Sequence, residues 1–480
     1  MFFDFLGMQT NKIGQAIRKG APLSEKEIIE QEITNWKVSI ARKIQITGER
    51  YYCGEQDILR HKRTVIGQNG QLIEVSNLPN NHIIDNQYAK MVGQKSNYLV
   101  GQPLTFDTNN DEYQEALKDV FDQGFQKTLK NLATDTLNGG IGWLYVYYDA
   151  NGKFSFKRFE PFEILPFWKD SEHTELDFVG RVYEVEVFEG TKSRIIEKVE
   201  IYGIDGIERY TLSNSSLTAD TENSYSTYLT FEKDEGESID YNWGRIPIIP
   251  FKYNSKEIPL ITKVKSLQDA INRTLSDFQN NMQEDARNTI LVLKNYDGTD
   301  LGEFRRNLAT YGAVKVKTID GANGGLEALH VEVNSENYKT ILELFKKSLI
   351  ENAMGYDARD DRLNSNPNQM NLKSMYSDID LDANGMETEY QASFEKLIWF
   401  VNLYLMNSNK GNFENEYLKI IFNRDMLMNE TEVIGSLVKS VGILSNQTIV
   451  SQHPWVTDVQ QELERIKEEQ LPKGYEEAFT

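Results

Sequence analysis

The chain has 480 residues, of which 39% are hydrophobic and 26% charged, a composition typical of folded proteins with substantial apolar cores. No run of about 18 uncharged apolar residues occurs, so the sequence predicts no membrane-spanning helix. The 52 basic and 73 acidic residues give a net charge of −21. This charge argues against a protein that grips nucleic acid, because phosphate binding depends on Lys and Arg. Either nucleic acid is not a partner, or it passes an acidic wall that repels it.

The N-terminus and the single cysteine bear on the compartment. The first seven residues are apolar but carry an acid where a secretory signal carries a base, so we do not expect export. Cys53 is the only cysteine and cannot form an intrachain disulfide, which fits a reducing cytoplasm or a particle assembled there. We expect Cys53 to be a buried or half-buried packing residue.

The N-terminal part of the chain is predicted to be mainly helical. Ser24 and Glu27 have capping-box spacing, and the apolar residues that follow recur at helical intervals up to Ile40. A turn-rich segment covers residues 51–79. Further helices are expected over 83–99 and 112–138.

A β-rich block then covers the chain to about residue 250. Two apolar, aromatic runs flank the hairpin signal Asp149-Ala150-Asn151-Gly152. Polar stretches are expected to be surface loops, and two prolines near residue 250 argue against a central strand there. The predicted strands are 143–148, 153–156, 179–188, 198–202 and 225–231.

From residue 258 the pattern changes to long helices. Apolar residues step by three or four from Leu260 to Met282, which predicts an amphipathic helix. A short β insert follows, with strands over 289–294, 313–318 and 326–333, and a second helix from Tyr338 ends near Gly355. The polar stretch 357–371 is expected to be a loop.

The strongest helical pattern of the chain follows that loop. Ten apolar residues from Leu372 to Tyr404 recur at close to 3.6 residues, which predicts a helix about 50 Å long. A helix of this length implies an architectural role. One more strand over 417–422 and a charged final helix from about residue 457 complete the chain. This order of elements predicts an α+β fold.

No motif indicates a catalytic site. The five histidines lack zinc-ligand spacing, and neither a Walker A sequence nor a nucleophile elbow is present. Asp378, Asp380, Asp382 and Glu389 have the spacing of a calcium loop, but Ala383 stands where that loop needs glycine. We therefore interpret these acids as a solvated helix face, and the acids of the 357–361 segment as partners of Arg359 and Arg362.

Several segments of the chain resemble the portal proteins of tailed bacteriophages, specifically the SPP1-type portal family, and they follow one another in the order found in that family. They cover nearly the whole chain, and the best match leads from Trp243-Gly244-Arg245-Ile246-Pro247 into the Leu267–Asn272 and Ser276-Asp277 stretch. The other segments that carry the resemblance are Asn86–Val92, Tyr98-Leu99-Val100-Gly101-Gln102-Pro103, Trp143–Lys153, Phe159–Pro166 and Leu444–Glu469.

The resemblance implies a layout of named parts. These are a helical and β wing, two stem helices, a small α/β clip, a tunnel loop, a long helix and a helical crown. The implied boundaries are 1–257 for the wing, 258–288 and 335–357 for the stem helices, 289–334 for the clip, 358–372 for the tunnel loop, 373–408 for the long helix and 409–480 for the crown and C-terminal region.

The resemblance also implies which residues meet DNA or protein partners. Basic and amide side chains of the second stem helix and the tunnel loop are expected to face a DNA channel, where they would touch phosphates without reading sequence. These residues are Lys339, Lys346, Lys347, Arg359, Arg362, Asn364, Asn366, Asn368 and Gln369. The lysines have an alternative, because Glu343 and Glu351 could pair with them. Arg305 and Arg306 of the clip are expected to meet the packaging motor or adaptor, or else to be plain surface residues.

The implied function is that of a non-enzymatic ring, usually a dodecamer in the family, at one capsid vertex. In such a ring we expect the Leu260–Met282 and Leu372–Tyr404 stripes to be buried against neighbouring subunits around a common axis. Its partners would be double-stranded DNA, the terminase large subunit, a head–tail adaptor, and the scaffold and major capsid proteins, with no membrane, cofactor or metal. It would occupy the virion, and the host cytoplasm during assembly. The alternatives are a metal-dependent DNA-processing enzyme that uses the acids of 357–361, and another virion connector or minor head protein.

Overall fold

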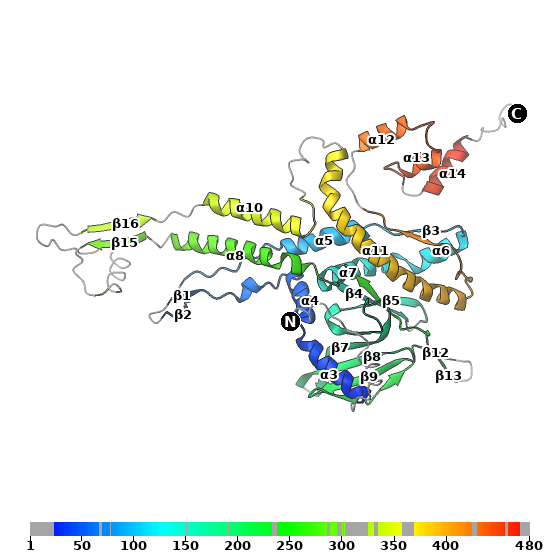
Figure 1. Ribbon diagram of the computed structural model, residues 1–480, viewed down its shortest axis with the longest axis horizontal. Helices are drawn as coiled ribbons and strands as arrows, with labels where there is room; N and C mark the ends of the chain where they lie inside the picture. Colours follow the sequence, from blue (N-terminus) through cyan, green and yellow to red (C-terminus); the bar gives the residue numbers. More distant parts are fainter. Residues whose placement is uncertain are drawn as a thin grey trace, which may run out of the picture. The chain divides into compact units, whose positions relative to one another are not determined.

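The computed structural model describes residues 24–66, 70–76, 78–149, 151–189, 192–232, 238–285, 289–294, 300, 302, 325–330, 335–357, 369–424, 430–456 and 459–470 (Figure 1). It contains both helices and strands, and most of its strands follow one another in the run from residue 141 to residue 252, so the α+β prediction is confirmed. The chain divides into two compact units. Unit 1 consists of Met1–Tyr52, Ala89–Lys263 and Ile350–Thr480, and unit 2 of Cys53–Tyr88 and Val264–Leu349.

Helices occur in both units. In chain order they are α3 (Glu25–Val38), α4 (Ile40–Tyr52), the 3₁₀ turn η1 (Asp57–Arg60), α5 (Gln87–Val100), α6 (Asp111–Val120), α7 (Gln123–Gly139), the 3₁₀ turn η2 (Pro161–Glu163), α8 (Ile261–Asp285), α10 (Ser335–Asn352), α11 (Gln369–Asn407), α12 (Glu430–Lys439), α13 (Asn446–Ser451) and α14 (Val459–Gln470).

The strands that pair within the described residues are all antiparallel. They are β1 (Thr64–Ile66), β2 (Leu72–Glu74), β3 (Thr105–Asp107), β4 (Ile141–Tyr148), β5 (Phe154–Phe159), β6 (Ile164–Trp168), β7 (Leu176–Glu189), β8 (Lys192–Tyr202), β9 (Ile207–Ser213), β10 (Ser216–Ala219), β11 (Tyr225–Ser226), β12 (Leu229–Glu232), β13 (Ser238–Tyr241), β14 (Ile248–Lys252), β15 (Thr289–Lys294), β16 (Gly325–His330) and β17 (Lys419–Ile421).

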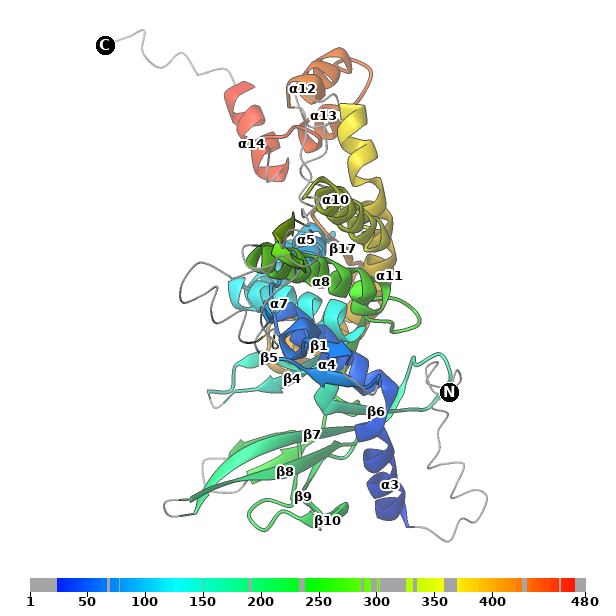
Figure 2. The ribbon, with the colours of Figure 1, turned by 90° about the vertical axis from the view of Figure 1, so that its left-hand side faces the viewer.

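The largest sheet of unit 1 has the order β10-β9-β8-β7-β6, with β11 paired to β9. Helix α3 covers one face of this sheet, as Figure 2 shows, and its buried residues Ile28, Ile29, Ile33 and Trp36 join the sheet's apolar cluster. The predicted capping box starts this helix, since Ser24 and Glu27 bond each other's backbone N–H.

A three-stranded sheet, β14-β4-β5, forms the second layer of unit 1. Its edge strand β14 contains Pro250, a position where the missing N–H breaks no inner ladder bond. Helices α7 and α11 pack against this sheet. The predicted hairpin is confirmed, because β4 and β5 pair across the Asp149–Gly152 turn, where Gly152 has φ 73°.

The apolar stripe of α11 is buried within the protein's own unit 1. Tyr390, Phe394, Leu397 and Val401 have no solvent exposure, and Phe394 lies against the rings of Phe251 and of other aromatic residues. Our expectation that neighbouring subunits cover this stripe is therefore wrong, because sheet β14-β4-β5 already covers it.

Several predicted boundaries differ from the structure. The single helix expected over 112–138 is two helices, because Asp122 caps α7 with its side chain on the Phe125 N–H. Strand β9 was not predicted, and β10 lies in the polar stretch 213–224 that suggested a loop. Helix α11 begins at Gln369, inside the stretch expected to be a loop. The strand expected over 313–318 lies outside the described residues.

Unit 2 consists of two long helical segments and the extended chain beside them. Figure 1 shows α8 and α10 running side by side with the hairpin β15–β16 beyond their ends. The rings of Phe278 and Tyr338 lie 5.1 Å apart, and Asn281 donates to the Tyr338 hydroxyl. The hairpin β1–β2 belongs to the same unit and is exposed. Cys53, expected to be buried, is exposed.

Candidate functional site

A ladder of four buried polar residues on α8 organises unit 2. Gln268, Asn272, Ser276 and Asn280 are each at most 3% exposed and recur every four residues, so they lie in one row on the helix. We call this row the polar ladder. A buried polar side chain costs free energy unless it is hydrogen-bonded. The chain before α5 supplies these bonds.

The segment 81–88, which is extended up to the start of α5, binds the polar ladder through its backbone. The N–H groups of Asn81, Ile83 and Asp85 donate to Asn280, Ser276 and Asn272 at 2.8–3.0 Å. The N–H of Tyr88 donates to Gln268, which donates in return to the Asp85 carbonyl. Four residues of α8 advance about 6 Å along the helix, and two residues of the extended chain advance about 6.6 Å. From Asn81 to Asp85, every second backbone N–H therefore lies opposite the next residue of the polar ladder.

Lys346 of α10 is joined to the same segment. Its ammonium lies 2.6 Å from a carboxylate oxygen of Asp85, and the two side chains are 34% and 25% exposed. The lysine therefore has a partner in its own unit, and that partner is neither Glu343 nor Glu351. A partly exposed pair of this kind contributes modestly to stability.

Lys339 and Lys347 occupy more open positions on α10. Lys339 is 76% exposed and lies 3.9 Å from Glu343, the partner that the sequence offered as an alternative. Lys347 is also exposed. Because exposed ammonium groups keep most of their hydration, both remain available to a mobile polyanion.

The described part of the chain shows no common site for the other residues that the sequence indicated. Gln369 is the first residue of α11. The remainder lie outside the described residues: Arg305, Arg306, Arg359, Arg362, Asn364, Asn366 and Asn368.

Comparisons with known proteins identify the family of this chain. The family model described as phage portal protein, SPP1 Gp6-like, matches residues 39–471. The chain belongs to this family. A portal protein of Bacillus phage SPP1 is 30% identical over 93% of this chain and 88% of the relative. A portal protein of Clostridium phage phiCD119 is 29% identical over 88% of this chain and 91% of the relative.

One solved structure with a weaker likeness is described as the neck of a native GTA particle computed with C12 symmetry. It is 10% identical, with a TM-score of 0.40, over 75% of this chain and 88% of that chain. This likeness is too low to argue from. The portal-family assignment rests on the sequence matches.

The acids with calcium-loop spacing do not converge in this portal-family chain. Asp382 is 10% exposed and pairs with Lys95, while Asp380 pairs with Arg424. Our interpretation of a solvated helix face is therefore wrong for Asp382, which is largely buried. Among the described residues no group of three or more His, Cys, Asp or Glu side chains could hold a metal ion. No described helix is long and apolar enough to cross a membrane.

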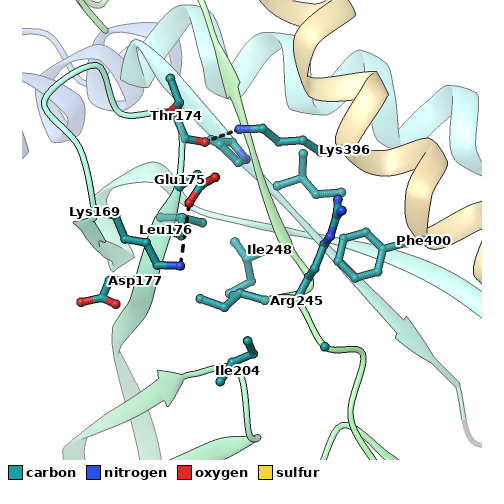
Figure 3. A pocket seen from close by; sticks show the side chains of 14 residues that line it. Lys169, Thr174, Glu175, Leu176, Asp177, Ile204, Arg245, Ile248, Lys396 and Phe400 are labelled. Carbon is teal, nitrogen blue, oxygen red and sulfur yellow. Dashed lines mark hydrogen bonds and ion pairs between the residues drawn. The ribbon is translucent and has the colours of Figure 1, made fainter.

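Unit 1 of this portal-family chain also contains an open pocket of about 360 Å³ (Figure 3). Its cations are already engaged. Lys396 donates to the Thr174 carbonyl at 2.6 Å, Lys169 lies 3.9 Å from Glu175, and Arg245 lies over the Trp399 ring. Burial lowers the pKa of Lys396, and nearby Lys252 lowers it further. The Lys396 bond joins the β6–β7 loop to α11, and the Arg245 contact joins the chain before β14 to the same helix.

Sequence reasoning missed the polar ladder, although a signal was present. Polar residues in a helix normally indicate the solvent face. Four uncharged ones spaced by four, with charged residues elsewhere on the helix, are a different pattern. The family resemblance pointed to the same stretch, 267–277, without giving the reason.

Proposed function

We propose that this chain is one subunit of a portal ring at a capsid vertex that conducts double-stranded DNA. The family match over residues 39–471 carries this proposal. Membership of the portal family implies a ring-forming homo-oligomer, and we propose a dodecamer. The ring would dock the terminase large subunit and a head–tail adaptor, meet scaffold and major capsid proteins, and have no catalytic role. It would assemble in the host cytoplasm.

We propose that the parts implied by the resemblance apply to this chain. The wing would comprise residues up to 257, and α8 and α10 would be the stem helices. The clip would cover 289–334, the tunnel loop 358–372 and the long helix 373–408. The crown would follow from 409. The side-by-side course of α8 and α10 and the hairpin β15–β16 support this division.

The channel lining that we propose has two classes of residue. Lys339 and Lys347 would form a sparse basic belt within an acidic tube, since even one lysine per subunit is repeated around the ring. Lys346 would contribute less because Asp85 partly neutralises it. Transient contacts with DNA would be added by Arg359 and Arg362 and by the side-chain amides of Asn364, Asn366, Asn368 and Gln369. Arg305 and Arg306 would face the motor or adaptor.

Electron microscopy of the purified protein tests the ring directly. We expect closed rings with a central hole, and symmetry analysis gives the subunit number. Particles that stay monomeric at every protein and salt concentration would overturn the proposal.

The basic belt is tested in a DNA-packaging assay with reconstituted procapsids. The double variant Lys339→Gln/Lys347→Gln should still form rings but package several-fold less DNA, because phosphate contacts are lost. Lys127→Gln/Lys130→Gln is the matched control, since both residues are exposed on α7. Equal packaging by the two variants would remove Lys339 and Lys347 from the channel.

A further inference from the structure

The chain that follows α10 makes an unusual turn before the segment 358–368. The N–H of Gly355 donates to the Ile350 carbonyl at 2.9 Å and that of Met354 to Glu351 at 3.0 Å, which is a Schellman motif. Its left-handed residue is Met354, with φ 52°, where glycine is usual. A side chain in this conformation costs about 1–2 kcal/mol, so surrounding contacts must hold it.

One face of α5 supplies those contacts. Lys95 donates to the Met354 carbonyl at 3.1 Å, and Gln94 donates to the Tyr356 carbonyl at 3.0 Å. Met91 lies so close to the turn that a Cβ on Gly355 would be 2.6 Å from its sulfur. Residues 91, 94 and 95 share a face of the helix, so α5 binds this turn over about one helical turn.

The same face of α5 also binds α11, which begins on the other side of the segment 358–368. Lys95 lies 2.6 Å from Asp382, with the two side chains 3% and 10% exposed. Tyr98 donates to Asp380 at 3.1 Å. Its ring stacks on Tyr376, which in turn contacts the ring of Tyr356 at 4.7 Å.

Lys95 is the one side chain among these contacts that bonds both flanks at once. Burial lowers the pKa of Lys95, and Asp382 opposes that shift. A buried ammonium needs several acceptors, and the Met354 carbonyl supplies one that a carboxylate alone would not. Asp382 keeps further partners in the Tyr253 hydroxyl at 2.9 Å and Lys263 at 3.7 Å.

We infer that Lys95 is a positioning residue that fixes the turn after α10 and the first part of α11 against α5, and that DNA packaging by the ring depends on this placement. The second half of this inference rests on the proposed function. The first half does not, because it concerns contacts within one chain. Lys95 itself touches no DNA in this role.

The test compares Lys95→Met with Lys90→Met, the same substitution at an exposed position of the same helix. Hydrogen exchange should show that the backbone amides of 354–357 lose at least tenfold protection in Lys95→Met only. Rings should still assemble, and packaging should fall several-fold. If Lys95→Met does not fold, Lys95→Met/Asp382→Asn removes both charges and is measured instead.

The outcomes separate the inference from the proposed function. Unchanged protection of 354–357 would overturn the positioning role, whatever the ring does. Lost protection with wild-type packaging would overturn its link to DNA. A wild-type ring that packages no DNA in any assay would defeat the proposed function and leave the exchange result standing.

Discussion

Units 1 and 2 are held together by different kinds of interaction. Among the described residues, unit 2 buries five polar residues beside five apolar ones, whereas apolar residues outnumber buried polar ones several-fold in unit 1. Apolar burial gives large, undirected stabilisation, while hydrogen bonds give modest net stability but strict geometry. Unit 1 is therefore stabilised mainly by its apolar core. In unit 2, hydrogen bonds of buried polar residues fix how the helix α8 and the extended chain align.

The largest effect should come from removing an aromatic ring in unit 1. Phe394→Ala deletes a side chain with no exposure that contacts the rings of Phe125 and Phe251. We expect the free energy of unfolding to fall by about 3–5 kcal/mol, measured by urea denaturation. Leu381→Ala, at a position 63% exposed on the same helix, should change it by less than about 0.5 kcal/mol. Similar losses in both variants would contradict a packed core here.

The next effect should come from the polar ladder. Asn272→Leu leaves the Asp85 N–H and the side chains of Gln268 and Gln56 without their shared partner. Buried groups left unpaired cost about 1–3 kcal/mol, so we expect a loss of about 2–3 kcal/mol. Hydrogen exchange of residues 81–88 measures it. Asp277→Leu puts the same side chain on the exposed face of α8 and should leave exchange unchanged; a stabilising Asn272→Leu would show that unit 2 behaves like unit 1.

A smaller, pH-dependent effect is expected at one polar cluster of unit 1. Burial alone would raise the pKa of Glu257, but the His173 ring at 2.8 Å and the Lys252 ammonium at 3.0 Å lower it below its usual 4.5. A depressed carboxyl pKa stabilises the fold above the unfolded value, and this contribution is lost as the pH falls through the folded value.

Glu257→Gln should therefore destabilise unit 1 by about 1–2 kcal/mol at neutral pH. The difference from the wild type should shrink as the pH falls below about 4.5, measured by thermal unfolding across pH. Glutamine keeps the size of the side chain at this left-handed position, with φ 55°. A difference that grows on acidification would show that the carboxylate is not stabilised by its neighbours.

The smallest effect should come from the exposed ion pairs of unit 2. Lys346→Ala removes the pair with Asp85 and should cost about 0.5 kcal/mol, because both side chains are partly solvated. Lys339→Ala is the control, since that side chain is 76% exposed, and should have no measurable effect on unfolding. If Lys346→Ala lowered the free energy of unfolding as much as Asn272→Leu, ion pairs and not the polar ladder would be the main source of stability in unit 2.

The sequence predicted elements whose signals are local. The Ser24 capping box, the Asp149–Gly152 hairpin and the long period of α11 each depend on residues close together in the chain. The α6–α7 break was missed because Asp122 caps α7 within an otherwise helical pattern. Strand β10 was missed because its polar residues resemble a loop.

The candidate site was less predictable because its decisive contacts are distant in sequence. Asp85 and Lys346 are far apart in the chain, so nothing local indicates that one neutralises the other. The burial of Asp382 depends likewise on Lys95. An acid in an amphipathic helix is normally solvated, and only tertiary structure reveals the exception.

The exposed thiol of Cys53 has a practical consequence. Because each chain carries a single cysteine, a maleimide dye would attach one fluorophore to every subunit at the same place. Stepwise photobleaching of individual assemblies would then count their copies one by one, without averaging over particles or imposing any symmetry.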